Sequence, residues 1–234
     1  MTTALQLETN RGNLLLSQLA VHERNAVHRG AETVPLEAGE LLVHSGRRSD
    51  FVFFPTNSVA SVVRTLRGGM SIELALIGNE GMVGLDVFTD AKASLDDVVV
   101  QSPGWAYRLP ADDLRRQFNR SGGLQKYLLL FADALLNQIA QTAVCSRYHA
   151  PEARLARWLL MIRDRTSVDE ILATPAAMRA MLAIAPERVA ECVARLVAAR
   201  AIVLRQETIT IVDREGLEVR ACECYETLSD MPLE

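Results

Sequence analysis

The sequence predicts an α+β protein with a β-roll in its N-terminal half, one long central helix and a C-terminal helix-turn-helix domain. Three observations lead to this prediction. Short β-rich runs separated by Gly, Pro, Asn and Asp clusters fill residues 34–109. A continuous helical pattern then extends from residue 124 to about residue 148. Two further helical patterns that begin at proline precede two β-rich runs near residue 206.

Composition excludes several classes of protein. The chain has 234 residues, of which 49% are hydrophobic, so it can bury a core in one large or two modest domains. The net charge of −4 excludes a strongly basic, histone-like binder. Four cysteines in a chain of this length do not make a disulfide framework. The N-terminus lacks the basic region of a signal peptide, and no stretch reaches about 18 consecutive apolar residues. We therefore expect a cytoplasmic protein without membrane segments.

The N-terminal half begins with one or two short helices in residues 13–30, where apolar and polar positions alternate at helical spacing. The β-rich runs that follow are LLVH, FVFF, SVASVVR, SIELALIG, DVVVQ and WAYRL. Many short strands separated by turn residues predict a sandwich or a small barrel. Residues 110–119 then predict a short helix, which ends at Ser121-Gly122-Gly123.

The long helical pattern carries an apolar seam whose members are spaced alternately by four and three residues, as in the a and d positions of a coiled coil. The seam consists of Leu124, Leu128, Phe131, Leu135, Gln138, Thr142 and Cys145. We expect it to pair with a second copy of the chain. The alternative is a core helix that packs on its own domain. At 1.5 Å per residue the helix would be nearly 40 Å long.

The last third of the chain predicts a winged helix-turn-helix. PEARLARWLLMIRDRT forms a first amphipathic helix, and Thr174-Pro175 caps and opens the next one. A short break at Ala183-Ile184-Ala185 precedes the helix PERVAECVARLVAAR. The segment AIVLRQETITIVD then predicts a hairpin around Gln206-Glu207.

This order of elements, with the segments EAGELLVHSG, IGNEGMVG, RLARWLLMIRDR and ITIVDREGLEVRACECYE, resembles the CRP/FNR superfamily of bacterial transcription regulators. The resemblance covers nearly the whole chain. It implies a cyclic-nucleotide-binding-like effector domain in residues 1–120, a dimerisation helix in 121–148 and a DNA-binding domain in 149–234. It also implies a homodimer and DNA as partners, with RNA polymerase as a further one.

The resemblance places an effector site at the glycine-rich turn, with Gly78, Glu80, Gly81 and Met82 as its candidate residues. The arginine that holds a cyclic phosphate in nucleotide-binding members is missing, because the later segment reads ASLDDV. We therefore expect no response to cAMP, with an unknown small molecule or none in the roll. The alternative for Glu80 is a turn carboxylate bonded to nearby backbone. Glu73 is expected on the solvated face of a strand.

In the predicted helix-turn-helix, the turn has the sequence Ala183-Ile184-Ala185-Pro186, where relatives commonly carry Gly-Val-Arg-Arg. We expect Glu187, Arg188 and Glu191 to face bases and Arg195 and Arg205 to contact phosphates. The domain has 11 Arg and 14 Asp and Glu, a net charge of −3, which weakens its attraction to DNA. The alternative function is therefore a dimeric sensor or scaffold that acts through protein partners or an unknown ligand.

Other chemistry finds little support in the sequence. Cys145 and His149 could form a nucleophile pair only with an orienting third group, so a structural role is favoured. Cys222-Glu223-Cys224 is a C-x-C without a second cysteine pair or a neighbouring histidine, which argues against zinc. The N-terminus carries no cysteine for an iron–sulfur cluster. We expect no metal, no cofactor and no enzymatic activity.

Overall fold

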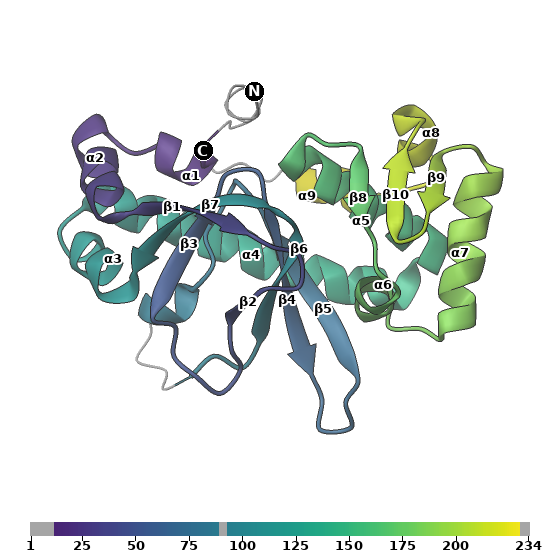
Figure 1. Cartoon of the computed structure of the whole chain (residues 1–234), viewed down its shortest axis with the longest axis horizontal. Helices are drawn as coiled ribbons and strands as arrows, with labels where there is room; N and C mark the ends of the chain where they lie inside the picture. Colours follow the sequence, from purple (N-terminus) through teal and green to yellow (C-terminus); the bar gives the residue numbers. More distant parts are fainter. Residues whose placement is uncertain (1–11, 89–92, 230–234) are drawn as a thin grey trace.

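The computed structural model describes residues 12–88 and 93–229 (Figure 1). Most of the N-terminal segment in which we expect no signal peptide lies outside these residues. Two short helices come first, α1 (Leu14–Ser17) and α2 (Val21–Gly30). This agrees with the prediction for residues 13–30.

The β-roll consists of two antiparallel sheets, ordered β1-β7-β3 and β2-β6-β4-β5. Its strands are β1 (Glu32–Leu36), β2 (Leu41–Val43), β3 (Phe51–Pro55), β4 (Val59–Thr65), β5 (Ser71–Ile77), β6 (Asp97–Ser102) and β7 (Gly104–Pro110). A 3-10 helix, η1 (Leu85–Phe88), lies between β5 and β6. All the predicted runs form strands, and β1 is an addition. The inward residues of both sheets form one core with α3 (Ala111–Phe118).

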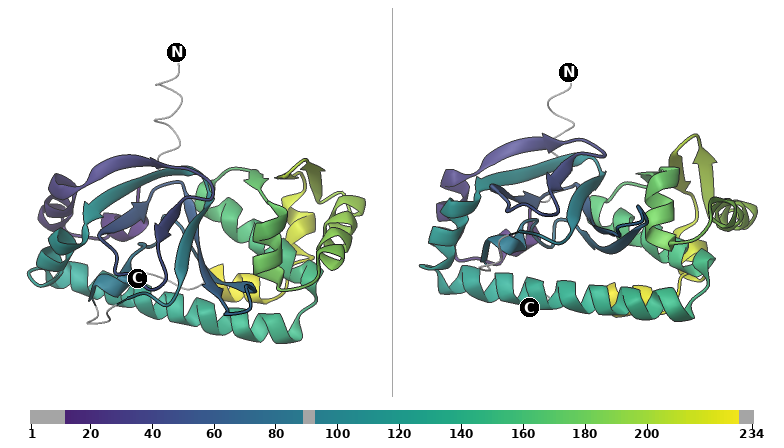
Figure 2. Two further views of the ribbon diagram at one scale, coloured as in Figure 1. Left: turned by 60° about the horizontal axis from the view of Figure 1, so that its bottom comes forward. Right: turned by 90° about the horizontal axis from the view of Figure 1, so that it is seen from below.

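Helix α4 (Gly122–Tyr148) is capped at its N-terminus by Ser121, whose hydroxyl accepts the N–H of Leu124. In Figure 2 it extends beneath the β-roll and on to the C-terminal domain. Leu124, Leu128 and Phe131 are buried in the core of the β-roll. These residues pack within one chain, so the expectation that they pair with a second copy is wrong.

The rest of the predicted seam also faces inward. Leu135 packs against the β-roll core, Cys145 is fully buried, and Thr142 is half-buried. Gln138 lies against β5, an edge strand of its sheet. Its Oε1 accepts the N–H of Leu76 at 2.8 Å, and its Nε2 donates to the Leu76 carbonyl at 3.0 Å. The amide therefore satisfies backbone groups that an edge strand leaves unpaired. The seam is the inner face of α4, which was the alternative interpretation.

The outer face of α4 carries apolar side chains without cover. Leu129 is 63% and Leu136 66% exposed, and Val144 is 48% exposed. By length and composition this helix is apolar enough to cross a membrane, although Asp133, Asn137 and the glutamines interrupt its apolar run. Its inner face is nevertheless committed to the β-roll. The outer face is the part of α4 that is available to a partner.

The C-terminal domain follows the predicted order. It comprises α5 (Pro151–Thr166), β8 (Glu170–Leu172), α6 (Pro175–Leu182), α7 (Pro186–Ala198), β9 (Ile202–Arg205), β10 (Thr208–Ile211), α8 (Arg214–Glu218) and α9 (Cys224–Ser229). The hairpin β9–β10 turns at Gln206 and pairs with β8. Thr174 caps α6 by accepting the N–H of Ala177. Strand β8 and helices α8 and α9 were not predicted.

Candidate nucleic-acid interface and effector site

The glycine-rich turn after β5 lies between the β-roll and two helices. A Cβ atom added at Gly81 would lie 2.0 Å from the Phe131 ring of α4. A Cβ atom added at Gly78 would lie 2.7 Å from the Arg165 side chain of α5. Met82 is fully buried in the roll. Glycine is therefore required at both positions because the turn packs closely against α4 and α5.

Glu80 in this turn pairs with the C-terminal domain. Its Oε1 accepts from the Arg165 Nε at 2.8 Å and from the Gly78 backbone N–H at 3.2 Å. Both side chains are largely buried. Protein atoms pack closely around Gly78 and Gly81, and the effector site expected at Gly78, Glu80, Gly81 and Met82 stays a prediction. The alternative for Glu80, a turn carboxylate bonded to nearby backbone, is confirmed.

The two aspartates of the segment in which the phosphate-binding arginine is missing contact other protein groups. Asp96 pairs with Arg64, and the Asp97 carboxylate accepts the N–H of Ser45 at 2.8 Å. A cavity lined by β2, β3 and the loop between them, including Arg47 and Arg48, has a volume of about 160 Å³. Small-molecule sites usually range from roughly 300 to 1,000 Å³. This cavity is too small for a nucleotide.

Glu73 of β5 is buried between the two domains, so its expected place on a solvated face is wrong. Its Oε2 accepts from the Ser61 hydroxyl at 2.7 Å and from the Trp158 indole at 3.2 Å. Burial raises the pKa of Glu73 to about 7, although these hydrogen bonds and the charges of Arg157 and Arg165 oppose that rise. Glu73 also lines a cavity of about 290 Å³ between the β-roll and α6.

Helix α7 presents the expected base-facing residues to solvent. Glu187, Arg188 and Glu191 are exposed on its first two turns, and Pro186 at its first position leaves one fewer N–H without a partner. Arg188 Nε lies 3.7 Å from Glu191 Oε2, one helical turn away. An exposed pair of this kind is weak, so the guanidinium is free to exchange partners.

Arg195 and Arg205 flank this face. Arg195 Nη1 lies 3.6 Å from Glu152 Oε2 of α5, and Arg205 is exposed at the end of β9 beside the hairpin turn. An open groove of about 890 Å³ is formed by α6, α7 and the hairpin. Alanine and valine side chains such as Ala190, Ala194 and Val197 line it. The candidate interface therefore combines a few charged side chains with an apolar floor.

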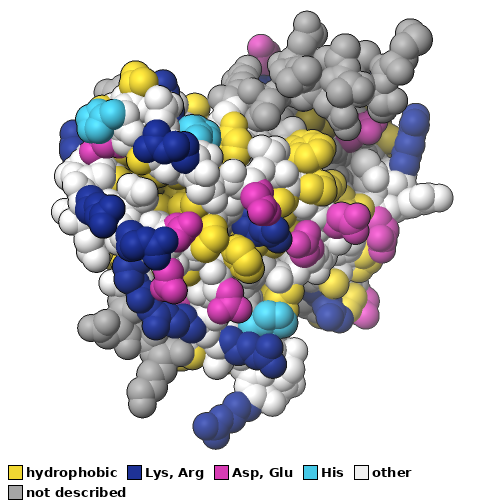
Figure 3. Space-filling view, turned by 60° about the vertical axis from the view of Figure 1, so that its left-hand side comes forward, with side chains coloured by type: hydrophobic (Ala, Val, Ile, Leu, Met, Phe, Trp, Pro, Cys, Tyr) yellow, Lys and Arg dark blue, Asp and Glu magenta, His cyan; other side chains and the backbone are white. Residues whose placement is uncertain are grey.

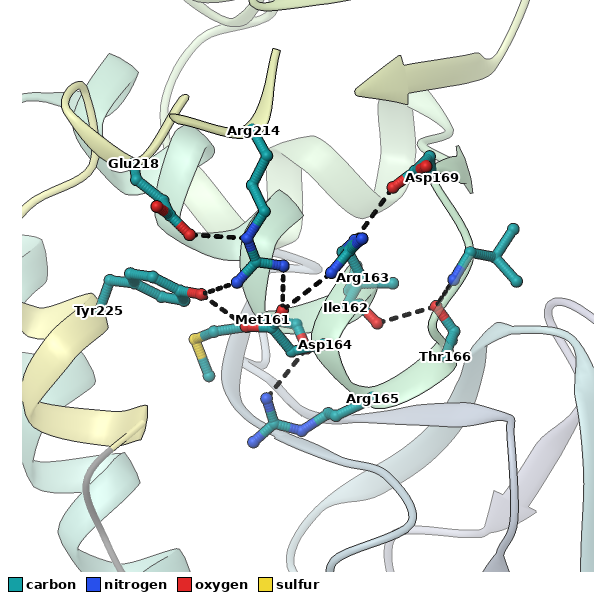
Figure 4. A network of polar contacts seen from close by, with 11 residues as sticks. Met161, Ile162, Arg163, Asp164, Arg165, Thr166, Asp169, Arg214, Glu218 and Tyr225 are labelled. Atoms are coloured by element: carbon teal, nitrogen blue, oxygen red, sulfur yellow. Dashed lines mark hydrogen bonds and ion pairs between the residues drawn. The ribbon is translucent and has the colours of Figure 1, made fainter. Parts of the chain in front are cut away.

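The arginines of α5 do not supply the positive surface that was considered for them. Arg154 and Arg157 are buried. The Arg163 Nε donates to Asp169 at 2.9 Å (Figure 4). Arg165 is paired with Glu80 of the β-roll. The same figure shows the guanidinium of Arg214 held by Asp164, Glu218 and the Tyr225 hydroxyl. These cations hold the domain together.

The far end of the β-roll is also unlike a DNA-binding surface. In Figure 3 arginine and lysine side chains lie interspersed with aspartate and glutamate over this end. Ion pairs such as Arg108–Glu32 and Arg116–Asp113 account for part of this mixture. Of the two ends of the molecule, the helix-turn-helix is the better candidate for nucleic acid.

A cluster of three cysteines and one histidine was not predicted from the sequence. Cys222 and Cys224, at the start of α9, lie against Cys145 and His149, at the end of α4. The expectation that no histidine lies near the C-x-C is therefore wrong in the folded chain, and one further cysteine, although not a second pair, lies beside it. The signal in the sequence was the pair of spacings C-x3-H and C-x-C, but nothing in it connects residues 77 positions apart.

Comparisons with known proteins agree with this architecture. Residues 33–121 match the family model of the cyclic nucleotide-binding domain, and residues 153–220 match that of the Crp-like helix-turn-helix domain. No curated protein matches the chain. FixK2 from Bradyrhizobium japonicum has a similar structure (TM-score 0.68, 12% identity, 82% of this chain and 98% of that chain).

Two other solved structures are similar at comparable levels. One is a CRP family transcriptional regulator from Thermus thermophilus (TM-score 0.67, 15% identity, 80% and 96% of the two chains). The other is the c-di-GMP responsive global regulator CLP of Xanthomonas campestris (TM-score 0.63, 10% identity, 82% and 99%). At these identities the structures show a shared fold. With both family models matched in the expected order, the chain belongs to the CRP/FNR superfamily of bacterial transcription regulators.

Proposed function

We propose that the protein is a cytoplasmic homodimeric regulator that binds DNA through α7 and the β9–β10 wing, and that it does not respond to cAMP. The observation that carries the proposal is the exposure of Glu187, Arg188 and Glu191 on the first turns of α7, the helix that follows the turn. In helix-turn-helix proteins these positions of the second helix contact base edges. Arginine suits guanine, and glutamate accepts from the cytosine amino group.

Phosphate contacts come from the flanks of α7. Arg195 of α7 and Arg205 of β9 are exposed, and each follows a residue that lines the apolar groove. The alanines of α7 leave room for close approach, and they offer apolar contact to thymine methyl groups. Because the domain carries a net negative charge, non-specific affinity is expected to be low and specific contacts to matter more.

The dimer is proposed to form through the outer face of α4. Leu129, Leu136 and Ala143 repeat every seven residues, with Ala140 between the last two. These residues are exposed in the isolated chain. A parallel pair of such helices buries this apolar stripe, and the two α7 helices then reach successive major-groove faces about 34 Å apart. RNA polymerase is a further partner by family membership, and we expect neither membrane insertion nor enzymatic activity.

The effector is proposed to be a molecule other than cAMP, or none. The β-roll offers a cavity of about 160 Å³ and lacks the phosphate-binding arginine in residues 93–98. CLP, a similar structure, is named as responsive to c-di-GMP, so a member of this fold need not use cAMP. Calorimetric titration with cAMP is expected to give no heat. Micromolar binding would contradict this part of the proposal.

DNA binding is tested by fluorescence anisotropy with the promoter of the protein's own gene and with random DNA, over a range of salt. Arg188→Ala is expected to cost about 1–3 kcal/mol on the specific site, and Arg205→Ala to weaken all sequences and lower the salt slope by about one. Arg29→Ala, an exposed arginine at the other end of the molecule, is the matched control. Equal, feeble binding to both DNAs at every salt concentration would instead favour the sensor or scaffold function.

The dimer is tested by Leu129→Asp with Leu136→Asp in light scattering. Two carboxylates in an apolar interface are expected to produce monomers, because a buried unpaired charge costs several kcal/mol. Lys126→Asp, near the edge of the same exposed face of α4, is the control for added charge alone. A double variant that remains dimeric would show that another surface joins the two copies.

A further inference from the structure

The cluster of Cys145, His149, Cys222 and Cys224 (the Cys–His cluster) lies where two distant parts of the chain meet. Cys145 and His149 are one turn apart at the C-terminal end of α4. Cys224 is the first residue of α9 and Cys222 lies just before it, after the whole helix-turn-helix domain. In Figure 2 this last helix, in yellow, lies beside the far end of α4. Three of the four side chains are buried.

The four side chains converge on one point. Each offers one ligand atom, and all four atoms lie within 4.8 Å of one another. Cys145 Sγ lies 3.4 Å from Cys222 Sγ, and Cys224 Sγ lies 3.4 Å from His149 Nδ1. In a tetrahedral zinc site, with zinc–sulfur bonds of about 2.3 Å, two sulfurs are about 3.8 Å apart. An iron–sulfur cluster would hold its ligands on different iron atoms and farther apart.

The surroundings also suit a metal centre. His149 turns Nδ1 toward Cys224, while its Nε2 lies 3.6 Å from a carboxylate oxygen of Glu223. A carboxylate on the second ring nitrogen is the usual partner of a zinc-bound histidine, since it fixes the tautomer and the ring orientation. The Gln141 amide donates to Cys224 Sγ at 2.9 Å. A donor of this kind stabilises a thiolate.

Charge balance gives a further argument. Three thiolates, one neutral imidazole and one divalent zinc ion have a net charge of −1. Arg157 of α5 is buried, and its Nε and Nη1 have no hydrogen-bond partner among the described residues. Its positive charge acts on both Cys145 and Cys222. The charge of Arg157 also acts on Glu73, and a loaded site with a net charge of −1 would place a second anion near this guanidinium.

We propose that Cys145, His149, Cys222 and Cys224 bind one Zn²⁺ ion, which fastens α9 and the end of the DNA-binding domain to the C-terminal end of α4. All four ligands come from the protein, so the site is closed, as in structural zinc sites. Because α4 carries the proposed dimer face, the ion fixes the orientation of each DNA-binding domain relative to the dimer. The zinc assignment itself does not depend on DNA binding.

The proposal is tested on the full-length protein purified under reducing conditions. Mass spectrometry of the metals is expected to find one zinc ion per chain. After chelation and reconstitution with Co²⁺, the visible spectrum should show tetrahedral ligand-field bands together with thiolate-to-cobalt charge transfer. A folded protein that binds neither Zn²⁺ nor Co²⁺ in this way would overturn the proposal. So would a stoichiometric iron–sulfur cluster or a Cys145–Cys222 disulfide that persists in reductant.

Single variants identify the ligands. Cys224→Ser and His149→Gln are expected to weaken zinc binding at least roughly 10- to 100-fold in competition with a chromophoric chelator, the loss seen even for outer-sphere partners. Cys192→Ser removes the buried cysteine of α7, which lies outside the cluster, and should retain wild-type zinc. Equal zinc affinity in Cys224→Ser and Cys192→Ser would overturn the assignment.

A second measurement applies even if a ligand variant folds poorly. Hydrogen exchange of the wild-type protein is compared before and after zinc removal by a chelator. Exchange in residues 222–229 and at the end of α4 should rise when zinc is removed, while exchange in the β-roll strands should not. Unchanged exchange at α9 would show that no ion fastens this helix.

Discussion

Helices α4 and α5 both pack against the β-roll, but they do so with different chemistry. α4 inserts Leu124, Leu128 and Phe131 into the core of the roll. α5 shares an apolar cluster with Val59 and Leu76 of the roll, and it adds polar contacts, a buried indole on Glu73 and a guanidinium on Glu80. Apolar packing is insensitive to pH, whereas a buried carboxylate is not. We therefore expect the packing of α4 on the roll to be independent of pH, whereas the packing of the DNA-binding domain on the roll depends in part on the charge state of Glu73.

The largest effect is expected at the inner face of α4. Phe131→Ala should lower the free energy of unfolding by about 3–5 kcal/mol, because it empties a buried site beside Gly81. Urea unfolding at about pH 5 and about pH 8 should give the same loss, since Phe131 packs in the apolar core of the roll. Lys126→Ala, exposed on the same helix, is the control. A strongly pH-dependent loss would break the distinction between the two helices.

The next effect is expected at Glu73, on the α5 side. Its pKa is raised by burial from 4.5 to about 7. Between these values the folded state keeps a proton that the unfolded state has released, so stability falls as pH rises through this window. Glu73→Gln should therefore be nearly neutral at about pH 4 and stabilising by about 1–3 kcal/mol at about pH 8.

The amide in this variant can still accept from Ser61 and Trp158 through its oxygen. The measurement is urea unfolding of wild type and variant at both pH values. Glu226→Gln, an exposed carboxylate on α9, is the matched control and should change neither curve. A variant whose stability relative to wild type is the same at both pH values would show that folding does not shift the pKa of Glu73, and the two interfaces would then respond alike to pH.

The same comparison explains what could be predicted from the sequence. Periodicity placed α4 and α5 within a few residues, because amphipathic spacing and capping residues are local properties. It did not predict which partner the α4 seam contacts, since a core and a dimer interface select the same apolar residues at the same spacing. Gln138 is the polar member of the seam, and it separates the two interpretations because its amide binds the backbone of β5. That partner depends on the tertiary structure and cannot be predicted from spacing along α4.

Charged residues were harder to place. Glu73 alternates with apolar neighbours in β5 as a solvated residue would, and only the approach of α5 buries it. The Cys–His cluster shows the same limit, because its two halves lie on α4 and after α8, and α9 was not predicted. Contacts between distant segments require the fold, whereas residue spacing reports only on neighbours along one element.

The smallest effect isolates local backbone strain from both interfaces. Ala183 ends α6 with φ 54° and ψ 42°, a left-handed conformation that costs an L-residue roughly 1–2 kcal/mol, and its side chain is exposed. Ala183→Gly should raise stability by about 0.5–1 kcal/mol, less than the full strain because glycine loses more entropy on folding. Ala198→Gly, helical at the end of α7, should lower stability by a similar amount. Thermal unfolding at two pH values measures both. A loss of stability in Ala183→Gly would show that the αL conformation at this turn is not strained. A gain in stability that changed with pH would show that this turn is coupled to Glu73, the titrating group that contacts α5.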